Sequence, residues 1–366
     1  MIELFDLRGQ YFELREEINA VVMETLAAGK YILGPRVRQL EKTIAAYCGT
    51  PYGVGVASGS DALYLSLAAC GIGEGDEVIT SPYTFFATAG AITRTGATPV
   101  FADIDYDTCN IDPERIKNRI TGRTRAIIPV HVFGQMADMD AVINLADKHG
   151  LVVIEDACQA MGAEYRGRRA GSLGHAGCFS FFPTKNLGGY GDGGMVVTGN
   201  DNLAARVEVL RAHGSRSKFV HESMGWNSRL DELQASVLLV KFKHLEMWIE
   251  KRKALAGYYN QLLGEVVNIP REMDGNRHTY HLYAIRTPHR DTIKTYLQRN
   301  GIDCGIYYPI PLHLQAAYRH LGYKAGDFPE AERAAGEVLA IPVHPGLAFP
   351  EIEKIARLVR EAILNA

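Results

Sequence analysis

Between residues 52 and 181, short apolar runs alternate with stretches whose apolar positions recur every three to four residues. Short continuous apolar runs are typical of strands buried on both faces, and the longer spacing is typical of helices. The predicted strands are Tyr52–Val56, Glu77–Thr80, Thr98–Phe101, Arg125–Val130, Leu151–Glu155 and Gly177–Phe181. This alternation predicts an α/β fold with a mostly parallel sheet between helices, in which ligands bind beyond the carboxyl ends of the strands.

The regions on either side of these strands have a different pattern. The first fifty residues are predicted to be helical and to end in an amphipathic helix around Pro35–Tyr47. From about Arg229 the apolar spacing predicts one long helix of the kind that joins two domains. Beyond Asn268, two shorter strand candidates, a Pro-rich stretch and terminal helices indicate a smaller α+β domain. We therefore expect an N-terminal segment with a large domain over residues 1–240, and a linking helix with a small C-terminal domain over residues 241–366.

Composition and charge narrow the class of protein. Apolar residues make up 47% of the 366 residues and charged residues 22%, as in ordinary globular proteins. Lys and Arg total 39 against 42 acidic residues, so the large basic surface that nucleic acid requires is not expected. The N-terminus has no secretory signal and no segment is long enough to span a bilayer, so we expect a cytoplasmic protein without a membrane partner. The six cysteines form no CxxC pair, which favours reduced thiols and argues against a zinc site or any other metal site.

The end of the first predicted strand carries a candidate phosphate site. Small residues around Gly59 and Ser60 open a helix there, and the free N–H groups of a helix N-terminus bind phosphate well. An ordinary helix cap by Ser58 or Ser60 explains the same residues equally well. The spacing of Gly53, Gly55 and Ser58 lacks the third glycine of a dinucleotide-binding loop, which argues against a Rossmann-type oxidoreductase.

Asp156 follows directly after the apolar run Leu151–Glu155. A buried carboxylate must be paired or hydrogen-bonded to offset its desolvation, so a partner is expected. If the cofactor is pyridoxal phosphate (PLP), that partner is the protonated pyridine nitrogen, which lets the ring act as an electron sink. Taken alone, a helix cap or a structural salt bridge is the more common explanation for such a residue.

Lys185 lies between an aromatic strand end and a Gly-rich loop, in the sequence SFFPTKNLGGYGDGG. A cramped, partly desolvated position suits an amine that must act as a nucleophile and a base. The pKa of a free lysine is near ~10.4, so catalysis requires that pKa to fall or the amine to be held as a Schiff base. Taken alone, a lysine beside glycines is more often an exposed loop residue.

Several segments together resemble one known family, the fold-type-I PLP enzymes of the nucleotide-sugar aminotransferase group (DegT/StrS type). The resemblance runs from LAAGKYILGP near the start to YPIPLH in the last part of the chain. The intervening motifs, in order, are ASGSDAL, GDEVITSPYTFFAT, PVHVFGQ, VIEDACQAMGA, SFFPTKNLGGYGDGG and NSRLDELQA. The resemblance implies a large PLP-binding domain, a smaller C-terminal α+β domain, and PLP as the cofactor.

Transferred residue by residue, the resemblance makes Lys185 the catalytic lysine that holds PLP as a Schiff base and Asp156 the partner of the pyridine nitrogen. Gln159 is expected near the phenolic oxygen of the cofactor, and Phe85 is expected to stack on its ring, although Phe85 could also serve only in core packing. The positions that match the family's phosphate site are Gly59, Ser60, Ser180 and Asn227. In the family this asparagine comes from the partner subunit, so the resemblance implies a homodimer with shared active sites.

A sugar nucleotide requires cationic groups for its diphosphate and polar groups for its hexose. Arg229, Tyr308 and His313 are the candidate substrate-binding residues. A surface ion pair for Arg229 and a packing role for His313 are equally open, and His131 at the end of a strand could serve only to close a hydrogen bond.

The resemblance implies transfer of an amino group from L-glutamate to a keto-sugar nucleotide, with Lys185 as the acid/base in both halves of the reaction. Lys185 stands where related dehydratases have histidine, which favours transamination. The motifs resemble enzymes that aminate C3 of the hexose more than those that aminate C4, and they indicate amino-sugar biosynthesis for surface polysaccharide, such as lipopolysaccharide O-antigen, or for glycosylated metabolites. A C4 aminotransferase and a PLP-binding regulatory protein without turnover remain the alternatives.

Overall fold

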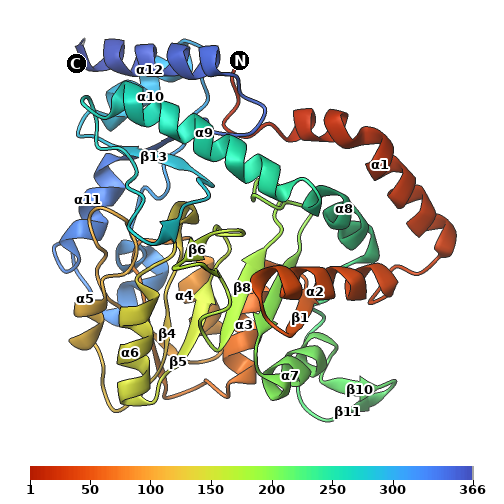
Figure 1. Ribbon diagram of the computed structural model, residues 1–366. Helices are drawn as coiled ribbons and strands as arrows, with labels where there is room; N and C mark the ends of the chain where they lie inside the picture. Colours follow the sequence, from red (N-terminus) through yellow and green to blue (C-terminus); the bar gives the residue numbers. More distant parts are fainter. Residues whose placement is uncertain (365–366) are drawn as a thin grey trace.

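The computed structural model describes residues 1–364 and has a parallel-rich sheet with helices on both faces (Figure 1). Within these residues the main sheet has seven strands in the order β1-β9-β8-β5-β4-β2-β3, and only β9 runs against the others. The strands of this sheet are β1 (Tyr52–Val56), β2 (Glu77–Thr80), β3 (Thr98–Phe101), β4 (Thr124–Ile128), β5 (Val152–Asp156), β8 (Ala176–Ser180) and β9 (Gly194–Thr198). The predicted α/β class is therefore confirmed, and each predicted strand is present to within two residues at either end.

The helices follow the strands and cover the sheet on both sides. Those associated with the sheet are α2 (Pro35–Cys48), α3 (Gly59–Ala69), α4 (Ala87–Arg94), α5 (Pro113–Lys117), α6 (Met139–His149), α7 (Asp201–Arg211) and α8 (Glu232–Phe242), whereas α1 (Leu7–Ala28) packs against α8. Asp6, Ser58, Asp138 and Asn200 cap α1, α3, α6 and α7 through their side-chain oxygens. These caps fix where each helix begins and therefore where the loops at the sheet edge lie.

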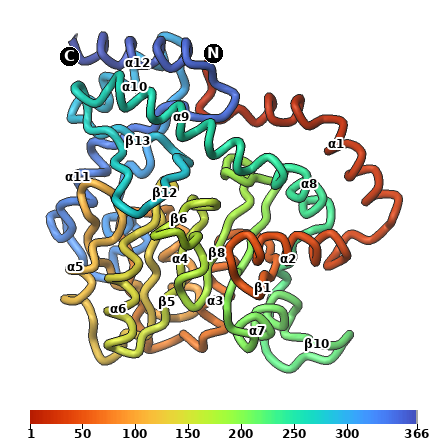
Figure 2. The backbone as a smooth tube through the Cα atoms, in the orientation of Figure 1, coloured from red at the N-terminus to blue at the C-terminus, as the bar shows by residue number. Residues whose placement is uncertain are grey.

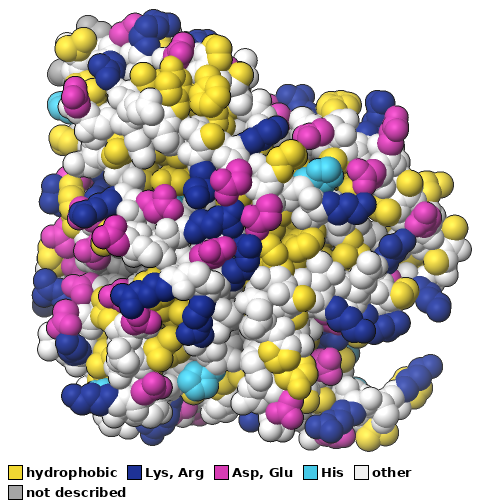
Figure 3. Space-filling view, in the orientation of Figure 1, with side chains coloured by type: hydrophobic (Ala, Val, Ile, Leu, Met, Phe, Trp, Pro, Cys, Tyr) yellow, Lys and Arg dark blue, Asp and Glu magenta, His cyan; other side chains and the backbone are white. Residues whose placement is uncertain are grey.

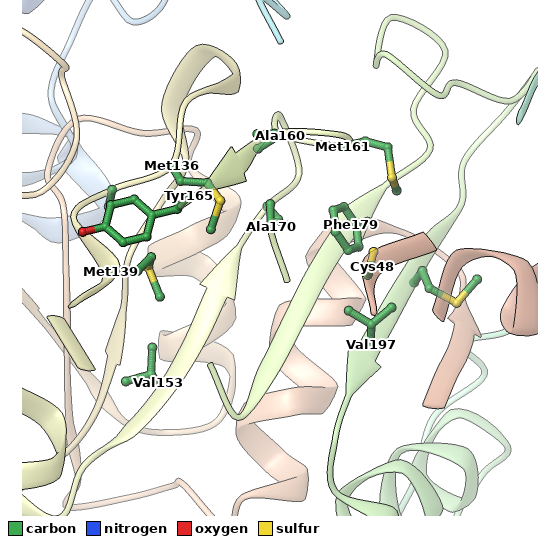
Figure 4. Packing of buried hydrophobic residues seen from close by; sticks show 14 of the residues in the cluster. Cys48, Met136, Met139, Val153, Ala160, Met161, Tyr165, Ala170, Phe179 and Val197 are labelled. Carbon is green, nitrogen blue, oxygen red and sulfur yellow. The ribbon is translucent and has the colours of Figure 1, made fainter. Parts of the chain in front are cut away.

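Alternate residues of the central strands pack into two separate cores, as the two-residue period of a strand requires. Val153 and Val197 face a core with α2, α6 and α8, shown from close by in Figure 4, whereas Ile154 and Val196 face a core with α3, α4 and α7. Residues of this kind are buried on both faces of the sheet, which explains why the sequence shows continuous apolar runs.

The remaining elements form a second group beyond α8 (Figure 2). They are α9 (Leu245–Leu263), β13 (Tyr283–Arg286), α10 (Arg290–Arg299), α11 (Pro329–Glu337), β14 (Val338–Ile341) and α12 (Phe349–Leu364). The short strand β12 (Asn276–Arg277) lies in the same stretch of chain but pairs with the main body. Strands β13 and β14 pair antiparallel and share a core with α9, α10 and α12. The N-terminus joins this group, because Ile2 forms a bridge with Ile302. The predicted division into domains between residues 240 and 241 is not tested by these elements and stays a prediction.

The prediction of one long helix from about Arg229 was wrong. The chain forms two helices, α8 and α9, separated at Lys243 and His244. Helix α8 packs against α1 and α2, whereas α9 packs against α12, so a change of direction lets each helix bury its own apolar face. The apolar spacing continues across the break, which is why the pattern did not reveal it. Strand β9 was also not predicted.

Small strands decorate the main body. They are β6 (Glu164–Tyr165) and β7 (Arg168–Arg169), which pair with β12, and the hairpin β10 (Ser215–Ser217) and β11 (Val220–His221). The hairpin extends away from the body of the molecule (Figures 1 and 2). Acidic and basic side chains are interspersed on the face shown in Figure 3. None of the described helices is long and apolar enough to cross a membrane.

Candidate active site

The carboxyl ends of β1, β2, β4, β5 and β8 meet at one edge of the sheet, and the loop that carries Tyr307 and Tyr308 lies against this edge. The Tyr83 hydroxyl donates to the Tyr307 carbonyl at 2.5 Å, and the Leu312 amide donates to the Pro82 carbonyl at 2.7 Å. These bonds join the large sheet to the C-terminal part of the chain and enclose the strand ends between them.

Asp156 is the last residue of β5 and is 5% exposed. Its Oδ2 accepts a hydrogen bond from the Thr88 hydroxyl at 2.7 Å, and its Oδ1 accepts one from the Cys158 amide at 3.2 Å. Among residues 1–364, no Lys, Arg or His lies in ion-pair contact with this carboxylate. The structural salt bridge considered from the sequence is therefore not formed, and a buried acceptor remains with capacity for a cationic donor.

Lys185 lies in the tight turn that follows β8, where its amide donates to the Phe182 carbonyl at 2.9 Å. The side chain as a whole keeps some exposure, but its amine is enclosed, and this burial lowers the pKa of Lys185. Cys158 and Asp156 oppose that shift, because a negative charge on either favours the charged amine. A lowered pKa raises the share of neutral amine, the form that attacks carbonyls and accepts protons.

The start of α3 forms a narrow cradle beside β8. Ser58 caps this helix, because its Oγ accepts from the Asp61 amide at 3.1 Å. A Cβ atom added at Gly59 would lie 2.7 Å from Ser180 Cβ and 2.8 Å from Cys158 Sγ, so only glycine fits. Ser60 is exposed at the second position of the helix. The start of α3 thus lies directly against Ser180, and free amides at a helix N-terminus suit a phosphate group.

Aromatic and amide groups form the opposite side of the strand ends. Phe85 is 58% exposed, and its ring centre lies 6.2 Å from that of Tyr308, so its ring does not serve in core packing within this chain. Gln159 is held at both ends, since its Oε1 accepts from the Phe133 amide at 2.8 Å and its Nε2 donates to the Tyr308 hydroxyl at 2.8 Å. Burial raises the pKa of the Tyr308 phenol, which keeps its hydroxyl protonated.

The other candidate residues lie farther along the chain. Arg229 has a buried Nε without a hydrogen-bond partner among the described residues. His313 is 1% exposed, with its Nε2 3.1 Å from Glu332 Oε1 and its ring against Phe328. Asn227 is exposed and follows the loop that carries the hairpin β10–β11. The structure therefore brings Lys185 and Asp156 together, whereas it holds His313 by contacts with α11.

Sequence reasoning did not assign roles to Thr88 and Glu155. Thr88 contacts Asp156 directly, and its only signal was its place in the segment GDEVITSPYTFFAT. His131 does close a hydrogen bond, as one interpretation held, because its Nε2 lies 2.9 Å from Glu155 Oε2 and both side chains are fully buried. Its Nδ1 accepts from the Ala137 amide at 3.2 Å, so Nε2 carries the proton and donates the hydrogen bond to Glu155. In the part of the chain that is described, no group of three or more His, Cys, Asp or Glu residues is placed to hold a metal ion.

The site residues present fit PLP. The buried carboxylate of Asp156 suits the N–H of a pyridinium ring, the α3 cradle suits a phosphate, and the enclosed amine of Lys185 suits an aldehyde.

Comparisons with known proteins point in the same direction. A model of the DegT/DnrJ/EryC1/StrS aminotransferase family matches residues 13–360. A Geobacillus stearothermophilus protein called a pleiotropic regulatory protein is 51% identical, over 98% of this chain and 99% of its own length. The dTDP-3-amino-3,4,6-trideoxy-alpha-D-glucose transaminase of Streptomyces venezuelae is 45% identical, over 98% of this chain and 96% of its own. The crystal structure of S. venezuelae DesV in complex with a ketimine intermediate is similar with a TM-score of 0.97 and 45% identity, over 98% of each chain. The family resemblance, the fold and the PLP cofactor predicted from the sequence are thereby confirmed.

Proposed function

Since the chain belongs to the DegT/DnrJ/EryC1/StrS aminotransferase family, whose members use PLP, we propose that it transfers an amino group from L-glutamate to C3 of a keto-sugar nucleotide. One observation carries this proposal. An enclosed lysine amine, Lys185, and a buried carboxylate, Asp156, follow neighbouring strands at the same end of the sheet, and no cation lies in ion-pair contact with the carboxylate. In transamination the amine holds the cofactor and moves a proton, and the carboxylate holds the cofactor's ring nitrogen. A PLP-binding regulator would also use a lysine amine to hold the cofactor, so turnover is what distinguishes the two roles.

Each residue of the site has a separate task in this proposal. Bound PLP supplies an electron sink for the carbanion that forms when the amino compound loses its α-proton. Asp156 holds the ring N–H, the first amides of α3 at Gly59 and Ser60 hold the phosphate with Ser180, and Phe85 faces the ring. Lys185 first binds the cofactor through its Nζ and then, once displaced, moves a proton with the same atom.

The sugar nucleotide is proposed to contact three residues. Arg229 has an unpartnered Nε that suits a diphosphate oxygen, and Tyr308 has a protonated hydroxyl beside Gln159. His313 offers its buried Nδ1, which has no partner among the described residues, because its Nε2 is engaged by Glu332. Amination at C3 is supported by the 3-amino product in the name of the S. venezuelae relative.

The site is proposed to be completed by a second copy of the chain. Asn227 is exposed, and the hairpin that precedes it carries Phe219 at 84% and Val220 at 56% exposure, with Met224 at 85% just beyond the hairpin. Exposed apolar side chains on a protruding hairpin are suited to burial against a partner. In a shared site, Asn227 of each subunit reaches the phosphate cradle of the other.

Subunit exchange tests the shared site. Lys185→Ala and Asn227→Asp chains are each expected to be inactive as homodimers, because one lacks the amine and the other repels the cofactor phosphate. Each mixed dimer contains one site with an intact Lys185 and an intact partner Asn227, so turnover should reappear on mixing. If exchange is confirmed by mass spectrometry of differently tagged chains and no turnover returns, Asn227 does not act across the interface.

The reaction itself is tested with a panel of keto-sugar nucleotides that vary in base, in the C2 substituent and in keto position. The expected result is glutamate-dependent amination of a 3-keto sugar, with the new C–N bond located by NMR. Amination of 4-keto sugars alone would replace C3 by C4. Absence of turnover with every substrate, in protein that holds PLP, would favour a regulatory role.

A regulatory role is the second candidate, because the G. stearothermophilus relative carries a regulatory name. The two roles differ in turnover rather than in cofactor binding, so the panel separates them. The proposed setting is the cytoplasm, in amino-sugar biosynthesis for surface polysaccharide or glycosylated metabolites.

A further inference from the structure

A cavity of about 140 Å³ lies beside Lys185. This volume is several times what one water molecule needs. Its walls come from the start of α1, the turn before Lys185, helix α9 and the loop after β14. Asp156, Gly59 and Ser180 are not among its lining residues, so the cavity touches the cofactor site only at Lys185.

Arg252, on α9, is the principal cation in this wall. It is 5% exposed, and burial lowers its pKa to about 10. Its Nη1 donates only to the carbonyls of Tyr280 and Val343, at 3.4 and 3.5 Å, which are long for hydrogen bonds. Among residues 1–364, no carboxylate lies in ion-pair contact with it. A buried guanidinium without an anion is costly, so the cavity is suited to an anionic ligand.

Besides Lys185 and Arg252, the titratable groups that line the cavity are His344, Asp6 and Glu13. His344 lines the same wall, is 7% exposed and has an Nδ1 without a partner among the described residues. Asp6 lies across the cavity, but its Oδ1 already accepts from the Gly9 amide at 2.7 Å as the cap of α1. Burial lowers the pKa of His344, so its ring is neutral, and Arg252 is the group whose charged donors face a ligand close to the reactive amine.

We infer that this cavity binds a carboxylate group of the amino donor, with Arg252 as the main contact. A guanidinium presents paired donors that match the two oxygens of a carboxylate, and the cavity opens beside the lysine at which the amino compound must react. The inference rests on the proposed function for its choice of ligand, because an aminotransferase must admit an amino acid next to its catalytic lysine. Arg252 is then a determinant of donor binding, separate from the residues that hold the sugar nucleotide.

Binding is measured without turnover in the PLP-loaded protein. The probe is glutarate, a dicarboxylate that lacks the amino group and cannot react. Trp248 lines the cavity, and the chain has two tryptophans, so Trp226→Phe leaves Trp248 as the sole tryptophan reporter. Glutarate should change the Trp248 fluorescence saturably. In this background Arg252→Gln should weaken glutarate binding by roughly 10- to 100-fold, the range for loss of a charged hydrogen-bonding partner.

Three matched variants identify the cause. Arg299→Gln removes an exposed arginine from α10 and should bind glutarate like the parent. Asp6→Asn keeps the helix cap but removes a negative charge from the cavity, so it should bind glutarate at least as tightly. Arg252→Lys keeps the charge without the paired donors and should weaken binding less than Arg252→Gln. It also tests the site if Arg252→Gln does not fold.

Steady-state kinetics complete the test. Loss of Arg252 should raise the KM for glutamate by a similar factor and leave the KM for the sugar nucleotide within about twofold. Folded Arg252 variants that bind glutarate as tightly as the parent would overturn the inference. If glutarate binding depends on Arg252 but no amino acid serves as donor, the carboxylate site stands and the proposed function fails.

Discussion

Glu155 and Asp156 are neighbours on β5, and both are buried, yet their surroundings differ completely. Successive side chains on a strand point to opposite faces of the sheet. Glu155 receives a bond from His131 and three from the amides of Gly171, Leu173 and Gly174, all between 2.6 and 2.9 Å. Asp156 receives one from a hydroxyl and one from the amide of its own turn.

This difference separates a structural carboxylate from one that is available for a ligand. Burial opposes the charge of Glu155, but its hydrogen bonds from His131 and the amides outweigh burial and lower its pKa. Its bonds fasten the loop before β8 to the sheet. Asp156 keeps acceptor capacity beside Lys185, in a place where burial makes an added hydrogen bond strong. Two adjacent carboxylates thus differ in role because of what surrounds them.

The largest expected effect comes from removal of the amine beside Asp156. Lys185→Ala should lose transamination by several orders of magnitude, because no other amine occupies its place, while some PLP stays bound through the cradle and Asp156. The measurements are turnover and the PLP content after gel filtration. Near-normal turnover would end the assignment of Lys185.

A second buried lysine provides the control for that variant. Lys241 is 1% exposed and donates to the Gly188 carbonyl at 2.5 Å, and burial lowers its pKa to about 8. Lys241→Met should lower the free energy of unfolding by about 1–3 kcal/mol but keep a PLP linkage that borohydride reduces. Retention of that linkage would show that a lowered pKa alone does not identify the catalytic lysine, whereas its loss in folded Lys241→Met would assign the linkage to Lys241 and overturn the role of Lys185.

The next effect in size concerns Asp156. Asp156→Asn should keep the fold and lower the rate of transamination by orders of magnitude, because the charge partner of the cofactor ring is lost. Stopped-flow absorbance of the reaction with glutamate measures the rate. A rate within about threefold of the parent would show that the ring nitrogen has another partner.

Glu155 should behave in the opposite way. Glu155→Gln should lower the free energy of unfolding by roughly 3 kcal/mol. The new side-chain NH2 cannot accept the hydrogen bonds that a carboxylate oxygen accepted from His131 or the amides, so buried donors lose their acceptor. The measurement is urea unfolding at pH 7. A stable variant that has lost its turnover would reverse the roles of the two carboxylates.

The lowered pKa of Glu155 also predicts how the free energy of unfolding depends on pH. The pKa of Glu155 is lowered by folding, so its contribution to stability is full above the ordinary pKa of roughly 4.3 and is lost as pH falls through the lower pKa of the folded state. The unfolding free energy of the parent should therefore fall more steeply below about pH 4.3 than that of Glu155→Gln. Equal slopes in urea unfolding between pH 5 and 3 would contradict the prediction.

The smallest effect is expected at Thr88, which contacts Asp156. Thr88→Val preserves shape and removes the hydroxyl, so it should slow transamination by about 10- to 150-fold, since one hydrogen bond to a charged group contributes about 1.5–3 kcal/mol. Thr198→Val is the matched control, because Thr198 is also buried but donates to the carbonyl of His175, just before β8. It should affect stability only. Equal loss of rate in both variants would mean that Thr88 acts through general packing.

The sequence alone determined much of this picture. The continuous apolar runs specified six of the seven strands of the main sheet, since the central strands are buried on both faces, and the motifs around Asp156 and Lys185 specified the family. Both kinds of information are local: a strand or a motif is written in consecutive residues. The break between α8 and α9 was not readable, because helical spacing continues through Lys243 and His244.

Tertiary structure decided what each local motif does. The sequence places Glu155 and Asp156 side by side without saying which is satisfied. The partners of Glu155 lie 16 to 24 positions away, and Asp156 has Cys158 in its own turn and Thr88 at 68 positions away. It likewise gives no hint that Arg252 lines a cavity with Lys185, since α9, the start of α1 and the loop after β14 meet only in the folded chain. Hydrogen bonds and charge act over a few ångströms, and only folding brings residues distant in the chain within that range.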